Sequence, residues 1–373
     1  MSTRTMKLWF AVFVLAGLTI SVLGPASAQM EGFSPIDNFR VWNLDEYEAE
    51  TGNTIASFRE APMLAEMVAS NQLPPLEERL PVREDIQVVQ PREAIGQYGG
   101  EIRFNATNPT SFGNTGFTAW DQHLAGLSTN WEVIFPQVAK SIELSDDLTT
   151  VTVTLRRGTK WSDGVPFTAD DVMFWYEDIM LNEELPNLPA QHRPGGQPVV
   201  VEKVDDYTVN FIYSQPYPAA IPLFTSLAPF APRHYLQKWH IAYNENAAEL
   251  AAEEGFDTWA AAFEFHYNGQ TGQNDFDPDL PVLKPWRLEE VDQFGNKFYV
   301  RNPYYWKVDT EGNQLPYIDR QVRALLSERE VVILNVQAGD LDYGYYNIEV
   351  SDLPVLRAGE AEGDYTTILW PAS

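Results

Sequence analysis

Residues 147–176 read Asp147-Leu-Thr-Thr-Val-Thr-Val-Thr-Leu-Arg-Arg-Gly-Thr-Lys-Trp-Ser-Asp-Gly-Val-Pro-Phe-Thr-Ala-Asp-Asp-Val-Met-Phe-Trp-Tyr176. Apolar residues alternate with threonines over Thr150–Leu155, a pattern typical of a strand with one buried face. Gly158 ends this pattern, and Ser162-Asp163-Gly164 predicts a tight turn because glycine adopts positive φ angles easily. The stretch therefore opens with a strand and a turn.

A helix is expected directly after this turn. Thr168 precedes Asp171 by three residues, which is the spacing of a capping box, and the acidic pair Asp170 and Asp171 suits the positive end of a helix dipole. An apolar face follows at helical spacing and consists of Val172, Trp175, Tyr176 and Ile179. The whole stretch predicts a strand–turn–helix unit.

The same unit carries a family signature. Residues Arg156 to Val172 closely resemble the signature of the bacterial extracellular solute-binding proteins of family 5, which are the oligopeptide-, dipeptide- and nickel-binding receptors of ABC importers. In that family the signature does not contact the ligand but holds a small subdomain together. The resemblance therefore implies structural roles for Trp161, Asp163 and Gly164.

Further blocks resemble the same family in the expected order, namely Val204–Val209, Pro232–Leu236, Arg287–Trp306 and Gln337–Asp342. The resemblance implies an α/β fold of the two-lobed, periplasmic-binding-protein type II-like kind, with an extra subdomain in the first lobe. Family members are usually much longer, so we expect an incomplete second lobe and a C-terminally truncated chain. One departure is Val282-Leu-Lys-Pro-Trp286, which replaces a Gly-rich turn of many members, so the resemblance does not carry the ligand class.

The expected organisation is a signal peptide at 1–28, an N-terminal extension at 29–97, a first lobe at 98–288 that includes the small subdomain at about 128–200, and the beginning of a second lobe at 289–373. Local patterns predict further elements. These are a helix at Glu60–Ser70, an extended segment at Asn71–Pro81, a strand at Gly99–Phe104, a helix at Trp120–Leu127, a hairpin of Val199–Val204 and Tyr207–Tyr213, a hairpin turn at Phe294–Asn296, and a strand at Asp364–Trp370.

The N-terminus predicts export. Arg4 and Lys7 precede an apolar run over Leu8–Leu23, and Ala26-Ser27-Ala28 follows as a small-residue cleavage motif. A membrane anchor is disfavoured because the run is shorter than the roughly 20 residues that a spanning helix needs. The chain has no cysteine, which excludes disulfides and the lipidated cysteine of a lipoprotein. We therefore expect a periplasmic protein.

The composition excludes one class of partner. The formal net charge is −28, and no cluster of lysine or arginine offsets it locally, so nucleic acid is not an expected partner. An apolar content of 44% is that of a folded chain. The negative charge favours cationic ligands, although its usual meaning is solubility.

Catalysis is the competing class of function. The chain has 53 carboxylates, and a glycosidase needs only two at a suitable separation, but most carboxylates of an acidic exported protein are solvated. The sequence lacks Gly-x-Ser-x-Gly, Ser-x-x-Lys and His-Glu-x-x-His motifs. Asp275, Asp277 and Asp279 imitate a calcium loop, but Leu280 and Trp286 stand where such a loop needs Gly and Glu. We expect no enzyme activity, no cofactor and no metal.

Ligand contacts are expected in the loop after the first strand, because ligands of open α/β sheets sit outside the carboxyl ends of strands. Asn114, Thr115 and Phe117 fall where oligopeptide-binding relatives present backbone and short side chains to a peptide, although a plain surface turn is an equal alternative. Trp120 and Trp286 are candidates for lining the cleft, since flat aromatic faces stack on sugars or cover peptide side chains.

The resemblance implies a periplasmic substrate-binding component of an ABC importer, acting as a monomer. It would capture oligopeptides by lobe closure and deliver them to the membrane permease subunits. An oligosaccharide receptor of the same family and, more distantly, a secreted glycosidase remain alternatives.

Overall fold

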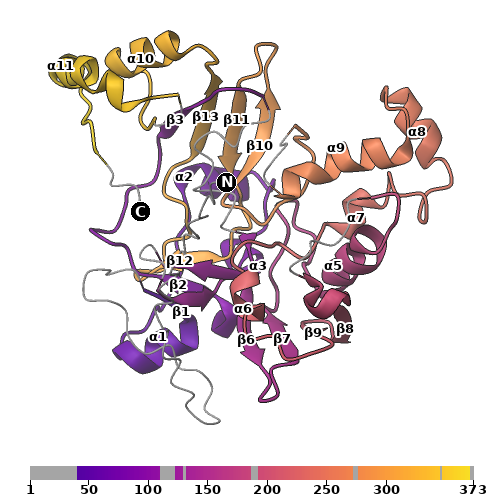
Figure 1. Cartoon of the computed structure of the whole chain (residues 1–373). Helices are drawn as coiled ribbons and strands as arrows, with labels where there is room; N and C mark the ends of the chain where they lie inside the picture. The colour runs from indigo at the N-terminus through magenta and orange to yellow at the C-terminus, as the bar shows by residue number, and fades with distance from the viewer. Residues whose placement is uncertain are drawn as a thin grey trace, which may run out of the picture. The chain divides into compact units, whose positions relative to one another are not determined.

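The computed structural model describes residues 40–109, 122–128, 132–185, 192–271, 276–344 and 347–369. Four sheets are formed within these ranges (Figure 1). One has the strand order β10 (Trp286–Val291), β11 (Lys297–Arg301), β13 (Arg320–Leu325) and β3 (Glu101–Ala106). A second has the order β6 (Ala139–Leu144), β7 (Thr150–Leu155), β9 (Thr208–Ile212) and β8 (Val200–Asp205).

Two smaller sheets complete the described strands. They consist of β1 (Val41–Asn43), β2 (Gln87–Val89) and β12 (Lys307–Asp309), and of β4 (Ala125–Leu127) paired with β5 (Ile134–Pro136). Neighbouring strands are antiparallel except for two pairs, β2 with β12 and β3 with β13, which are parallel. Both parallel pairs join segments that lie far apart in the sequence.

Helices connect and cover these sheets. The α-helices are α1 (Leu44–Thr51), α2 (Pro62–Ala69), α3 (Leu76–Arg79), α5 (Ala169–Phe174), α6 (Ala220–Leu223), α7 (Arg233–Leu236), α8 (Ala247–Glu253), α9 (Trp259–Thr271), α10 (Arg329–Gln337) and α11 (Leu353–Gly363). Short 3₁₀ turns lie at η1 (Arg83–Asp85), η5 (Pro194–Gly196) and η6 (Val350–Asp352), and α5 continues as a π-helix, η3 (Trp175–Met180). No helix in these described ranges combines the length and the apolar character needed to cross a bilayer.

The strand–turn–helix unit is confirmed. Val151, Val153 and Leu155 of β7 are fully buried and alternate with half-buried threonines. The N-terminus of α5 is closed by the predicted capping box, since the Asp170 N–H donates to Thr168 Oγ1 (3.3 Å) and the Thr168 N–H donates to Asp171 Oδ2 (3.0 Å). The unit contributes to the larger of two hydrophobic cores.

The segment 40–97 has its own small core and is joined to the rest of the fold. Trp42, Leu44, Ile86 and Val88 pack together with Val308 of β12. Its β2 lies between β1 and β12, so this part of the predicted N-terminal extension completes a sheet with a strand that follows more than two hundred residues later.

Three local predictions are wrong in part. Residues 125–127 form strand β4 and not the end of a helix, because they pair with β5. At Gly126 a Cβ atom would lie 2.3 Å from the Phe135 ring, so only glycine permits this close approach. Residues 76–79 form the short helix α3 inside the segment predicted as extended, since Pro75 directly before it provides a suitable φ angle.

The third correction concerns the predicted strand at Asp364–Trp370. Residues 365–369 form no strand and fold back on α11, where the Thr367 N–H donates to Glu360 Oε1 (2.7 Å). Trp370 and the predicted signal peptide at 1–28 lie outside the described residues.

Candidate functional site

The predicted ligand-contact residues are only partly visible. Asn114, Thr115, Phe117 and Trp120 lie outside the described residues. Trp286 is described: it is the first residue of β10, is half-buried, and donates from Nε1 to the Ile318 carbonyl (3.0 Å).

The register of the sheet places Trp286 away from the carboxyl end of β3. Trp286 pairs with Arg301 on β11, and Arg320, the first residue of β13, pairs with Glu101, the first residue of β3. Trp286 therefore lies at the end of the sheet where β3 begins. The structure does not bring it to the opposite end, from which the predicted ligand loop leaves.

In the middle of β3, charged and backbone groups of Arg103 hold the loop after α10 to the strand. The Arg103 N–H donates to Asp342 Oδ2 (2.7 Å), and the Asp342 N–H donates to the Arg103 carbonyl (3.0 Å). The guanidinium of Arg103 also donates to both carboxylate oxygens of Asp342 and to the Gly339 carbonyl. These bonds hold the pKa of Asp342 below its ordinary value. The contact joins the sheet to the α10–α11 region (Figure 1).

Cationic and aromatic side chains share one face of this sheet. Lys297 of β11, Arg323 of β13 and Phe104 of β3 are direct neighbours across the strands and are all buried. Tyr343, from the loop that Arg103 holds, meets Phe104 edge to face with ring centroids 6.2 Å apart. We refer to Lys297, Arg323 and Phe104 as the cationic row.

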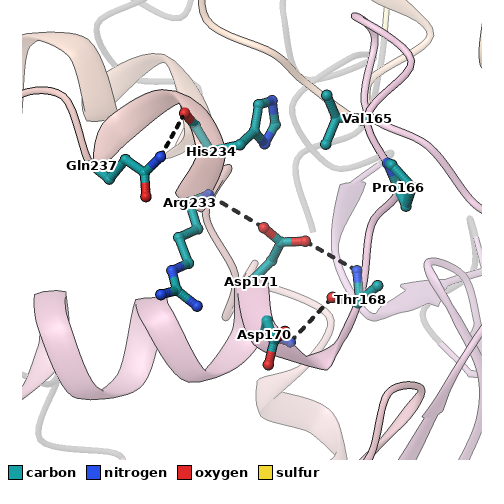
Figure 2. Close-up of a pocket in the computed structure, with 8 residues that line it drawn as sticks. All are labelled: Val165, Pro166, Thr168, Asp170, Asp171, Arg233, His234 and Gln237. Atoms are coloured by element: carbon teal, nitrogen blue, oxygen red, sulfur yellow. Dashed lines mark hydrogen bonds between the residues drawn. The ribbon is translucent and has the colours of Figure 1, made fainter. Parts of the chain in front are cut away.

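A hollow of about 250 Å³ lies at the N-terminus of α5, and Figure 2 shows the side chains that line it. Asp171 joins the start of α5 to the start of α7, because it accepts from the backbone N–H groups of Thr168 (3.0 Å) and Arg233 (3.2 Å) (Figure 2). It also accepts from Trp161 Nε1 (3.2 Å). Burial raises the pKa of Asp171 to about 6 against the effect of these hydrogen bonds.

His234, which lines the same hollow, forms a pair with the exposed Asp163. His234 lies 2.7 Å from Asp163 Oδ2, and the Val165 N–H donates to the other oxygen of Asp163 (3.1 Å). Burial acts to raise the pKa of Asp163, but these hydrogen bonds outweigh it and the pKa is lowered. The carboxylates here hold backbone and side chains of the signature unit in place, which favours the structural role expected from the sequence.

A second polar network surrounds His266 of α9. Its Nδ1 lies 2.5 Å from Asp277 Oδ2, its Nε2 lies 2.9 Å from Glu254 Oε2, and the ring stacks on Trp239 at 3.6 Å. Tyr235 donates to the same oxygen of Asp277 (2.7 Å). Asp277, an apparent calcium ligand in the sequence, thus serves this network. Among the described residues, no group of three acidic or histidine side chains is arranged to hold a metal ion.

A larger hollow of about 670 Å³ is formed mainly by α2, α3 and the segment between them. Its polar groups serve the fold. Tyr98 donates to the Gln314 carbonyl (2.9 Å), and Glu60 pairs with the buried Arg79. A further bond, from the Gln314 N–H to the Arg59 carbonyl (2.7 Å), fixes the 40–97 segment to the residues after β12.

Sequence reasoning did not single out Arg103 and Arg323. Both look like ordinary charged residues of short strands, so no local signal identifies them; the assembled fold buries Arg323 and leaves Arg103 half-exposed. Asp342 ends a block that was recognised, but its partner on β3 was not predictable from spacing.

Comparisons with known proteins agree with this architecture. A family model described as bacterial extracellular solute-binding proteins, family 5 Middle, matches residues 133–368. A periplasmic alpha-galactoside-binding protein of Rhizobium meliloti (strain 1021) is 28% identical over 309 residues, covering 74% of this chain and 42% of that protein.

Two solved structures are similar over most of the chain. An oligopeptide-binding protein, OppA, has a TM-score of 0.79 and 33% identity, covering 87% of this chain and 51% of its own. The periplasmic binding protein MelB of Agrobacterium fabrum C58, solved with stachyose, has a TM-score of 0.62 and 25% identity, with 87% and 47% covered.

The chain spans about half the length of these relatives. Their structures confirm the expected α/β fold of the type II periplasmic-binding-protein kind. Since the family model covers most of the sequence, the chain belongs to the bacterial extracellular solute-binding proteins of family 5.

Proposed function

We propose that this chain is the periplasmic substrate-binding component of an ABC importer and captures oligopeptides for delivery to the membrane permease. The observation that carries the proposal is the likeness to the oligopeptide-binding protein OppA, whose identity and TM-score are higher than those of MelB. Binding would take place without bond cleavage.

Capture requires two bodies that close on the ligand. We assign residues 98–288 to the first lobe, with the small subdomain at about 128–200, and residues 289–373 to the beginning of the second. This division follows the family resemblance; the parallel pairing of β3 with β13 and the bonds between Arg103 and Asp342 hold the two proposed parts together. Ligand contacts on both sides would favour the closed form, since only differential affinity shifts such an equilibrium.

The loop after β3 is the proposed peptide contact, through Asn114, Thr115 and Phe117. A peptide receptor of broad specificity holds the peptide backbone and leaves side chains in wet pockets. The net charge of −28 adds a preference for basic peptides that salt weakens.

A second candidate is an oligosaccharide receptor. It is favoured by the alpha-galactoside-binding relative and by the stachyose complex of MelB. Such a receptor would depend on aromatic stacking, for which Trp120 and Trp286 are the proposed side chains, and would respond little to salt.

Calorimetry with the whole chain distinguishes the two. The probes are the tripeptide Lys-Ala-Ala and stachyose, each at low and at high salt. We expect heat with the peptide, decreasing with salt, and none with stachyose. Binding of stachyose without the peptide would overturn the peptide proposal and favour the sugar receptor, and hydrolysis of stachyose, detected by chromatography, would contradict both.

A further inference from the structure

We infer that Arg323 is an anchor for a carboxylate group of the bound solute. The inference deepens the proposed function, because it names a chemical group that the ligand carries. It starts from a side chain for which the described residues supply no hydrogen-bond acceptor or ion-pair partner.

The described residues contain four buried arginines, and three of them are fully engaged. They are Arg79, Arg156 and Arg301. Each donates to two or more acceptors: Arg79 to two carbonyls and Glu60, Arg156 to two carbonyls and Asn43, and Arg301 to two carbonyls and Asp319. This chain therefore satisfies a buried guanidinium wherever it serves the fold.

Arg323 differs from these three. It is 4% exposed, its Nε has no hydrogen-bond partner, and it forms no ion pair with any carboxylate of the described residues. A cation removed from water without a partner opposes folding, so such a residue in a natural protein requires another explanation. A functional anion is the explanation that the surroundings favour.

A second cation lies directly beside it. Lys297 is the cross-strand partner of Arg323, on the same face of the sheet, and is also 4% exposed. Like charges at directly opposed positions repel each other. The chain has 53 acidic and 25 basic residues, so two adjacent buried cations run against its composition.

Aromatic rings orient the two cations. The Arg323 guanidinium carbon lies 4.4 Å from the centroid of the Tyr299 ring, and Lys297 Nζ lies 4.0 Å from that of Phe276. Stacking on a ring face stabilises a cation by less than water does, so for Arg323 the Tyr299 ring does not replace a counter-ion. It does leave the in-plane N–H donors of the guanidinium available, in the fork that matches the two oxygens of a carboxylate.

The position suits a ligand contact. Arg323 is the direct neighbour of Phe104 on the parallel strand β3, and Phe104 contacts Tyr343 from the α10–α11 side. The cationic row therefore lies in the carboxyl-terminal half of β3 and β13, and ligands of such sheets bind outside the carboxyl ends of the strands. A carboxylate here would come from a peptide C-terminus or from a uronic acid.

Two variants test the anchor. Arg323→Gln removes the charge, and Arg320→Gln is the matched control, because Arg320 lies on the same strand but is exposed and only 3.5 Å from Glu289 in a surface pair. Arg323→Lys keeps the charge and loses the fork. Circular dichroism establishes that each variant is folded.

The first measurement needs no knowledge of the ligand. Thermal unfolding is followed in sodium propionate and in sodium chloride of equal ionic strength. Propionate should raise the midpoint more than chloride in the wild type and in Arg320→Gln, and Arg323→Gln should lose this difference. Equal effects of the two salts on the wild type would overturn the anchor, whatever the variants do, and so would an undiminished propionate effect in Arg323→Gln.

The second measurement identifies the source of the carboxylate. Calorimetry compares trialanine with its C-terminal amide, and galacturonate with galactose. A charged hydrogen-bonded pair predicts that the acid binds roughly 10- to 100-fold more tightly than its neutral analogue in the wild type, and equally in Arg323→Gln. Preference for galacturonate alone would retain the anchor and remove the peptide proposal. Binding of trialanine and its amide with equal affinity would retain the peptide proposal and overturn the anchor.

Discussion

Replacing Trp161 by alanine should destabilise the fold strongly and leave ligand affinity of the folded protein unchanged. The indole is 0% exposed and packs edge to face on Phe167 (5.5 Å) and Phe230 (6.0 Å). Loss of this packing costs about 4 kcal/mol of unfolding free energy, from the area buried and the cavity that remains. Loss of the hydrogen bond to Asp171 adds about 1 kcal/mol.

Trp161→Phe separates the two contributions, because it keeps an aromatic ring and removes the N–H donor. We expect it to lose the hydrogen-bond contribution of about 1 kcal/mol and only a part of the packing contribution, because phenylalanine is smaller than tryptophan. Urea unfolding followed by circular dichroism measures both variants, and Phe294→Ala is the control, since Phe294 is 72% exposed and should change stability by less than about 0.5 kcal/mol. If Trp161→Ala unfolds like the wild type but loses ligand affinity, the signature contacts ligand and the structural assignment is wrong.

Two further predictions concern pH. Burial acts to raise the pKa of Asp85, but hydrogen bonds from Arg157 and other donors lower this pKa to about 2. The ionised carboxylate therefore contributes about 2 kcal/mol to the free energy of unfolding, and this contribution should be lost as pH falls from about 4 through 2. Acid titration of Asp85→Asn should lack this loss. Burial opposes but does not prevent a raised pKa of His266, because Asp277 and Glu254 stabilise the imidazolium; its contribution is complete below about pH 6.5 and disappears as pH rises through the higher folded value. Urea unfolding of His266→Gln at a series of pH values should show an unfolding free energy that depends less on pH over that window. An unchanged pH dependence would contradict the pairing of a charged His266 with Asp277 and Glu254.

The elements predicted correctly are those whose determinants are local. Strand β7, the capped start of α5 and the hairpin of β10 and β11 each depend on alternation, capping or turn residues within a few positions. In the hairpin, Asp292 accepts from the N–H groups of Phe294 and Asn296 (2.8 and 2.9 Å), so even the turn is fixed by its own side chains. Patterns of this kind can be read from sequence because no distant partner is needed.

The errors occur where distant segments decide the structure. Ala125–Leu127 has no strand pattern of its own, and pairing with β5 gives it one. The parallel pair of β3 and β13 joins residues 101–106 to 320–325, and no local pattern announces that partner. Tertiary context overrides local propensity at such places.

The candidate site was less predictable than the fold for the same reason. Trp286 is a candidate for lining the cleft because it is an aromatic residue beside a variable turn. The register of three strand pairs, however, places it at the opposite end of the sheet from the carboxyl end of β3. Arg323 looks like an ordinary charge in the alternating strand β13. Its burial next to Lys297 depends on which face the sheet covers, which only the assembled fold defines.

Arg156 explains why the signature and the 40–97 segment should be treated as one folding unit. Its buried guanidinium donates to the Gln137 carbonyl (2.7 Å) of the subdomain, and to Asn43 Oδ1 (2.7 Å) and the Asp85 carbonyl (2.8 Å) of the segment. Burial lowers the pKa of Arg156 to about 9, so this charge is tolerated only with those acceptors in place. Removing the segment would withdraw two of the three. The segment is therefore required by the signature that it covers, and a shortened chain that starts at β3 should leave the Arg156 guanidinium without two of its three acceptors in the middle of the subdomain.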